Sequence, residues 1–190
     1  MSYRIYRTDA IVLRSYPYRE ADRTLVLYTE DFGLLYAHAQ GIRHEKSKLR
    51  YALTDLSRAQ VALVRGKAGW RVTGAVSILL PTANKAGLLS LARIASLVTR
   101  LVQGEDRNDY LFRTLMAAHE RLAKGDPADL IEVVSVSRML HALGYIAPDT
   151  ATDESLFIDG AYEPAALDMT RPMLPRLLRR INDTLAVTQL

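Results

Sequence analysis

The chain has 190 residues, a length that allows one large domain or two small ones. Hydrophobic residues make up 49% and charged residues 24%, which excludes a disordered tail protein and a collagen-like fibre. Because cysteine is absent, disulfide frameworks, thiol nucleophiles and cysteine-ligated zinc or iron–sulfur sites are excluded. The start lacks the apolar core of a signal peptide and no run approaches membrane-spanning length, so we expect a cytoplasmic protein with no membrane partner.

The net charge of +4 is distributed unevenly along the chain. Residues 1–80 carry 13 lysines and arginines against 7 acidic residues, whereas residues 81–190 carry 12 against 14. Seven of the ten tyrosines also lie within the first 51 residues. This division predicts two domains, 1–80 and 81–190, and makes the first a candidate binder of polyanions.

Five short runs rich in β-branched and aromatic residues predict strands in the first domain; they cover residues 6–14, 23–29, 34–41, 58–65 and 70–77. Tight connections at 31–33 and 66–69 predict hairpins, and the longer connection includes a possible helical turn over 48–56. Alternation in the last run predicts one shared face for Trp70, Val72, Gly74 and Val76. We predict a five-stranded barrel of the OB type, with another small barrel as the alternative.

After Pro81 the apolar residues recur at helical spacing. A first helix is predicted after a capping Asn84, a second over 109–124, a third from Asp126 and Pro127 to residue 144, and a last one from about residue 173. Residues 145–163 predict an irregular acidic loop, with a small hairpin about Asp159 and Gly160. The fold class is therefore α+β, an amino-terminal barrel followed by an all-α helical domain.

Sequence patterns of enzyme active sites are missing. There is no GxxxxGK[ST] loop, no HxxxH or HExxH spacing and no GxSxG elbow. The acidic residues of 145–163 lack the order of a calcium loop. We therefore expect no catalytic residues, no metal and no cofactor.

Three basic features remain in the first domain. The segment GIRHEKSKLR predicts a phosphate clamp or, alternatively, a solvated charged loop; its cations are Arg43, Lys46, Lys48 and Arg50. A predicted turn over 15–19 places stacking rings beside cations, or else packs the rings on the barrel; its candidates are Tyr16, Tyr18 and Arg19, with Arg14 just before them. Lys67 and Arg71 flank the second hairpin, where alternation assigns Trp70 to the core.

The stretch AIVLRSYPYREADRTLVLYTEDFGLLYAHAQGIRHEKSKLRYAL, residues 10–53, resembles the amino-terminal domain of the RecO family of DNA repair and recombination mediators. The resemblance includes the IVL at 11–13, the turn at 18–22, the DFG at 31–33 and the basic segment at 41–50. It implies an OB domain that binds single- and double-stranded DNA and anneals strands in the nucleoid. Its implied partners are RecR, the acidic tail of single-strand-binding protein and, indirectly, RecA.

Many members of this family carry a four-cysteine zinc site in the loop that corresponds to residues 145–163, and this chain has none. The tail of single-strand-binding protein is expected on the helical domain, with candidate cations Arg93, Arg100, Arg107 and Arg113. Two other functions remain open. One is an RNA-binding OB protein, and the other is a helical adaptor whose barrel is only a scaffold.

Overall fold

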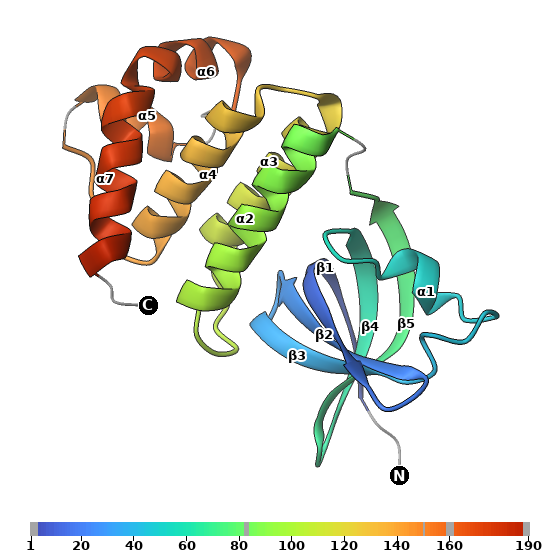
Figure 1. The fold of residues 1–190 in the computed structure, drawn as a ribbon. Coiled ribbons are helices and arrows are strands. Elements are labelled where there is room, and N and C mark those ends of the chain that lie inside the picture. The colour runs from blue at the N-terminus through green and yellow to red at the C-terminus, as the bar shows by residue number, and fades with distance from the viewer. Residues whose placement is uncertain (1–3, 82–83, 150, 159–161, 188–190) are drawn as a thin grey trace. The chain divides into compact units, whose positions relative to one another are not determined.

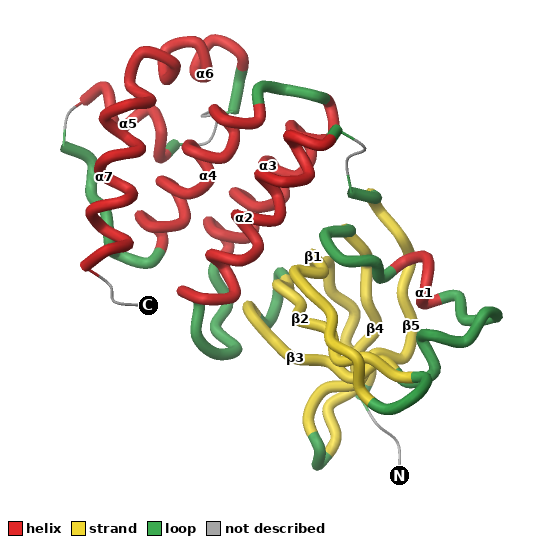
Figure 2. The backbone as a smooth tube through the Cα atoms, in the orientation of Figure 1, coloured by secondary structure: helices red, strands yellow, loops and turns green. Residues whose placement is uncertain are grey.

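The computed structural model describes residues 4–81, 84–149, 151–158 and 162–187, and it divides into two compact units (Figure 1). The first unit takes residues 1–81 and 102–112. The second takes residues 82–101 and 113–190. Figure 2 shows that strands belong to the first unit and that helices dominate the second.

The first unit is a closed five-stranded barrel with the strand order β1-β2-β3-β5-β4. Its elements are β1 (Ile5–Tyr18), β2 (Asp22–Thr29), β3 (Gly33–Ala39), α1 (Leu49–Ala52), β4 (Arg58–Gly66) and β5 (Gly69–Leu79). Neighbouring strands are antiparallel except β3 and β5, which are parallel. A closed five-stranded barrel followed by helices confirms the predicted OB-type fold class.

Alternating apolar side chains on the strands fill the barrel interior. Inward-facing Leu25 and Leu27 of β2 and Leu35 of β3 are at most 1% exposed, and Trp70 is buried with them as predicted. The expected alternation of β5 is wrong beyond Val72. The extra residue Thr73 forms a bulge against β4, so Ala75 packs on the core while Val76 is exposed.

The first hairpin is longer than predicted. Residues 15–18, expected in a turn, belong to β1, and the reversal takes place at residues 19–21. Arg19 has a positive φ of 55°, a conformation that suits a tight turn. Tyr16 and Tyr18 consequently project from a strand, whose pairing with β2 fixes their direction.

The segment 102–112 packs against the turn between β2 and β3. Gly33 has a φ of 64°, and a Cβ there would overlap the backbone carbonyl of Asp106. Phe112 stacks on the fully buried Tyr28, with ring centroids 6.4 Å apart. The DFG turn therefore needs glycine both for its backbone angle and for the close approach of this segment.

The second unit is built from helices α2 (Lys85–Leu101), α3 (Asp109–Lys124, of which residues 113–124 belong here), α4 (Ala128–Ala142), α5 (Ala151–Phe157), α6 (Pro164–Thr170) and α7 (Leu174–Val187), with a 3-10 turn at Arg171–Met173. In helix α4 every residue from Leu130 to Leu140 except Glu132 is buried, which fits a helix without a distinct polar face, and the helix contacts α2, α5, α6 and α7. No helix among the described residues is both long and apolar enough to cross a bilayer.

Two helix starts were predicted from capping residues, with different outcomes. Asn84 caps α2, because its Oδ1 accepts a hydrogen bond of 3.0 Å from the Ala86 amide. Asp126 does not cap α4; it forms an ion pair of 2.6 Å with Arg121. Helix α4 starts instead after Pro127, whose carbonyl accepts the first helical bond from Ile131.

The expected irregular loop over 145–163 contains helix α5. Its Leu156 and Phe157 are buried, which the acidic composition of the segment concealed. Arg138 of α4 donates to the carbonyls of Leu156, at 3.1 Å, and of Ile158, so it holds the end of α5. The hairpin expected at residues 159 and 160 lies outside the described residues.

Candidate nucleic-acid interface

A row of four paired residues crosses the outer face of the barrel. Tyr16 of β1 pairs with Thr24 of β2, Thr24 pairs with His38 of β3, and His38 pairs with Arg71 of β5. Core residues adjoin Thr24, His38 and Arg71 along their strands, so these three side chains point outward, and Tyr16 lies on the same face as its partner Thr24. The fold thereby brings together residues separated by as many as 55 positions in the sequence.

Exposed tyrosines and cations accompany this row. Tyr16, Tyr18 and Tyr36 are 38%, 45% and 55% exposed, whereas Tyr28 on the neighbouring part of β2 is completely buried. Arg14 lies 4.9 Å from the centre of the Tyr16 ring, and Arg19 lies 5.3 Å from the Tyr18 ring. We call this group the aromatic face; its members are Arg14, Tyr16, Tyr18, Arg19, Tyr36, His38, Lys67 and Arg71.

Part of the aromatic face is hollowed into a recess of about 750 Å³, whose lining includes Tyr18, Arg19, Tyr36, His38, Lys67 and Arg71. The turns β1–β2 and β4–β5 border it, as they border the ligand face of OB domains. His38 is fixed in place by Asp22, 3.2 Å away, and by the edge of the Tyr18 ring. The recess therefore has one wall held in place by the contacts of His38, and it is flanked by two turns that carry Arg19 and Lys67.

The chemistry of this face suits a single-stranded polyanion with flat bases. Exposed rings stack on bases of any sequence, and adjacent guanidinium or ammonium groups pair with phosphates. Tyr18 and Tyr36 supply rings, while Lys67 and Arg71 are exposed cations at the opposite border. Tyr36 and His38 were not among the predicted site residues, although their alternation with the apolar Leu35 and Ala37 would have placed them outside.

The four cations of the basic segment, residues 41–50, do not all lie together. Arg43 and Arg50 line a second recess of about 480 Å³ together with Arg23 of β2, which we call the arginine recess. Lys46 and Lys48 are exposed and do not line it. Arg23 was missed from sequence because its place beside Arg43 depends on how the connection after β3 folds back.

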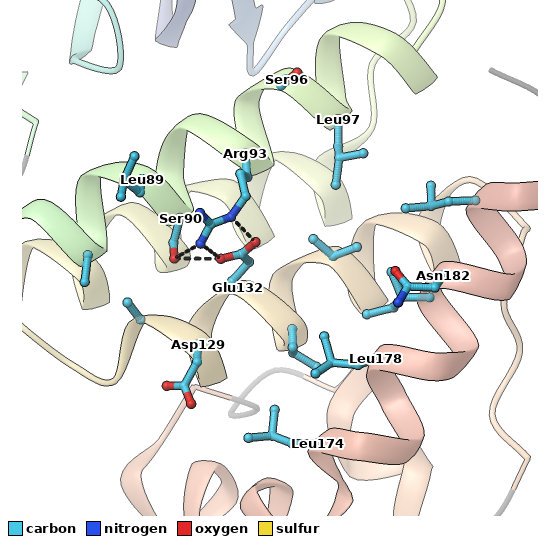
Figure 3. Close-up of a pocket in the computed structure, with 16 residues that line it drawn as sticks. Leu89, Ser90, Arg93, Ser96, Leu97, Asp129, Glu132, Leu174, Leu178 and Asn182 are labelled. Carbon is cyan, nitrogen blue, oxygen red and sulfur yellow. Dashed lines mark hydrogen bonds and ion pairs between the residues drawn. The ribbon is translucent and has the colours of Figure 1, made fainter.

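The helical unit holds an apolar groove of about 660 Å³ between α2, α4 and α7 (Figure 3). Its one arginine, Arg93, donates to the Glu132 carboxylate, with Nε 2.6 Å from Oε1, and Ser90 donates to the same carboxylate. This hydrogen bonding raises the pKa of Arg93 above its ordinary value. Apolar side chains form most of the wall: Leu89, Leu97, Leu174, Leu178 and Ile181.

The other candidate cations for a tail of single-strand-binding protein lie elsewhere. Arg107 belongs to segment 102–112 of the barrel unit, not to the helical unit, and pairs with Asp109 at 2.6 Å. Arg100 and Arg113 are exposed on α2 and α3. Across the parts of the chain that the structure describes, no three histidine or acidic residues are arranged to hold a metal ion.

The amino-acid sequence is similar to one family of known proteins. The family described as "Recombination protein O N terminal" matches residues 1–79. The "DNA repair protein RecO" of Heliobacterium modesticaldum is 36% identical over 145 residues, which cover 75% of this chain and 52% of that protein. The proteins of the same name from Dehalococcoides mccartyi and Rubrobacter xylanophilus are 34% and 32% identical, over 74% and 76% of this chain and 56% and 59% of theirs. The chain thus spans about half the length of these curated relatives.

Proposed function

Because this chain belongs to the RecO family, we propose that it is a non-enzymatic DNA-binding protein of recombinational repair that anneals complementary strands. The observation that carries the proposal is the aromatic face, where three exposed tyrosines lie beside exposed cations on the ligand side of an OB barrel. Both single and double strands present the phosphates that these cations would contact.

Annealing requires that the repulsion between the two strands is reduced and that each strand is held reversibly. Two complementary strands repel each other through their phosphates, and cations that neutralise both strands lower that repulsion. Stacking on tyrosines is tolerant of sequence, so a held strand remains exchangeable and its base edges stay open to pairing. The reaction needs no nucleotide energy, which fits a chain whose sequence has no phosphate-cradling loop.

We infer the partners from the family. The chain would act with RecR in the cytoplasm, close to the nucleoid, and would help RecA indirectly by displacing single-strand-binding protein. The acidic, hydrophobic tail of that protein fits the apolar groove only if Arg93 is released from Glu132. A tail peptide should therefore bind Glu132→Gln more tightly than the natural chain, and Arg93→Ala more weakly.

The test of DNA binding compares two pairs of substitutions with equal loss of charge. Lys67→Gln with Arg71→Gln removes two cations from the aromatic face, and Lys85→Gln with Arg100→Gln removes two exposed cations from α2. The slope of log affinity against log salt should fall by about 1.4 for the first pair on single strands, at about 0.7 per contact, and stay unchanged for the second. Annealing should decline with the first pair and proceed without ATP.

The alternative functions predict different results in the same assay. An RNA-binding OB protein would prefer RNA to DNA of the same sequence, because it would contact the 2′-hydroxyl. A helical adaptor would show no salt-sensitive binding to either nucleic acid. Equal slopes for the two substitution pairs would contradict the assignment of DNA to the aromatic face.

A further inference from the structure

The arginine recess is a feature of the barrel that the aromatic face does not use. Its three guanidinium groups come from separate segments: Arg23 from β2, Arg43 from the connection after β3, and Arg50 from α1. Asp55 contributes the one carboxylate of the lining. Positive charge from β2 and from two positions of the basic segment therefore converges on one hollow.

Hydrogen bonds orient two of these arginines before any ligand binds. Arg23 Nη1 donates to Ser15 Oγ at 2.7 Å, and Ser15 Oγ donates to Asp55 Oδ1 at 2.6 Å. Arg43 Nη1 donates to the carbonyl of Glu20 at 2.9 Å, and its backbone amide donates to Ala21. A guanidinium has five N–H donors, so one such bond leaves the remaining donors for an anion.

The floor of the arginine recess is fixed by the barrel core. Ile42 and Leu53 line it, are each 3% exposed and belong to the core cluster. The rim carries a single exposed ring, Tyr51, which is 69% exposed. Compared with the aromatic face, this hollow has more arginine and less ring surface, so it suits phosphates more than bases.

The turn between β1 and β2 lies between the two recesses. Tyr18 and Arg19 line the recess of the aromatic face, whereas Glu20 and Ala21 hold Arg43 of the arginine recess. The two hollows are thus separate, and a single turn links their positions. A strand in one would lie close to a strand in the other, with cations beside both.

We propose that the arginine recess binds the phosphodiester backbone of a second DNA strand while the aromatic face holds the first. The proposal rests on the proposed function, because it supplies the second strand that annealing requires. Arg23, Arg43 and Arg50 pair with phosphates, and Asp55 limits the affinity so that this strand exchanges. Lys46 and Lys48 take no part, although they belong to the same basic segment.

The number of short oligonucleotides bound to the full chain tests this directly. An oligothymidylate of about four nucleotides lies at the lower end of OB site sizes, which makes it too short to occupy both hollows. Native mass spectrometry should find two bound per chain, one after Arg43→Gln with Arg50→Gln, and two after the matched pair Lys46→Gln with Lys48→Gln. Asp55→Asn should tighten the second oligonucleotide several-fold by removing a negative charge.

Annealing separates the two hollows in a second way. The Arg43→Gln, Arg50→Gln chain should keep its affinity for one strand within about two-fold and lose most of its annealing rate. The Tyr18→Ala, Tyr36→Ala chain should lose the first strand and retain one oligonucleotide, which the Arg43 and Arg50 substitutions then remove. Unchanged melting temperatures would show that all these chains fold.

Each other result overturns the proposal in an identifiable way. One oligonucleotide on the natural chain would remove the second site and leave the proposed function intact, whereas none would remove both. Equal losses from the arginine and lysine pairs would indicate overall charge in place of a recess. A glutamate-rich peptide, or inorganic phosphate, that binds at these arginines tenfold more tightly than the oligonucleotide would assign the recess to an acidic protein or to a free anion.

Discussion

Arginine side chains have different roles in the two units. In the barrel unit, Arg43, Arg50 and Arg71 are exposed around hollows. In the helical unit, Arg138 is only 3% exposed and is bonded to Thr114 and to carbonyls at the end of α5. Arg93 there pairs with Glu132 of a facing helix. The barrel unit displays several of its cations around hollows, whereas the helical unit uses several of its cations to hold itself together.

This contrast shows why net charge alone is a weak guide to a binding surface. Residues 1–80 contain 13 lysines and arginines, and residues 81–190 contain 12. Those of the helical unit that pair with carboxylates or lie buried have little capacity left for phosphates. Mutations should therefore affect stability when they remove a paired or buried arginine of the helical unit, and DNA affinity when they remove an exposed cation beside a hollow of the barrel.

The largest effect on stability is expected from Arg138→Met. The change leaves the oxygens of Thr114, Leu156 and Ile158 without this donor, and because each unsatisfied buried acceptor costs about 1–3 kcal/mol, we expect a total loss of about 3–5 kcal/mol. Denaturant unfolding followed by far-ultraviolet circular dichroism should show this loss. Fluorescence of the single tryptophan, Trp70, reports on the barrel and should show a much smaller shift.

The control is Arg100→Met on the exposed side of α2. It removes the same charge and should change the free energy of unfolding by at most about 0.5 kcal/mol. If both substitutions have the same small effect, Arg138 is not a structural residue. The contrast between the two units would then fail.

The burial of Arg138 also marks the limit of prediction from sequence. Helical periodicity predicted α3 with both its ends, because the spacing of apolar residues is a local property. In α4 the same periodicity found the helix, but which side an arginine faces depends on α5 and on Tyr162, which are distant in sequence. The acidic composition of residues 145–163 therefore predicted a loop, where the structure has helix α5 with its end bonded to Arg138.

The barrel shows the same division between local and distant information. Alternation and turn residues predicted five strands and their order along the chain. The bulge at Thr73 escaped because one additional residue reverses the faces without changing the composition. Tyr36 was within reach of alternation, whereas Arg23 was not, because its partners come from the connection that folds back after β3.

The next effect concerns the DFG turn. Gly33→Ala should destabilise the barrel by about 2–5 kcal/mol, from about 1–2 kcal/mol for a left-handed alanine and about 1–3 kcal/mol for the overlap with Asp106. Gly104→Ala has a similar positive φ and open space around its Cβ, so it should cost only about 1–2 kcal/mol. Unfolding monitored by Trp70 fluorescence compares them, and equal costs would contradict the close packing of segment 102–112.

Tyr36→Ala tests the displayed side of the barrel. Loss of one stacked base should cost about 1–3 kcal/mol of binding, a fall of about 5- to 150-fold in affinity for oligothymidylate. Tyr145→Ala removes a ring that is 41% exposed in the helical unit and should leave the affinity unchanged. Fluorescence anisotropy measures both, and a loss for Tyr145 equal to that for Tyr36 would remove the distinction between the units.

The smallest effect at neutral pH is expected from Tyr28→Phe. Within the described part of the chain, the Tyr28 hydroxyl is buried without a hydrogen bond, so its removal should stabilise the barrel, by about 1 kcal/mol or less, while the ring still stacks on Phe112.

At high pH the two chains should differ. Burial, with the nearby charges of Asp106 and Asp109, raises the pKa of Tyr28 far above its ordinary value of about 10. Because the unfolded chain loses this proton first, the natural barrel loses stability as the pH rises above about 10. Tyr28→Phe should lack that part of the loss, so the two curves of unfolding free energy, which run parallel near neutral pH, separate further in favour of the variant. Curves that stay parallel through this range would mean that the Tyr28 hydroxyl reaches solvent in the folded barrel. Segment 102–112 would then not cover Tyr28, and the difference between the buried Tyr28 and the exposed Tyr36 would be lost.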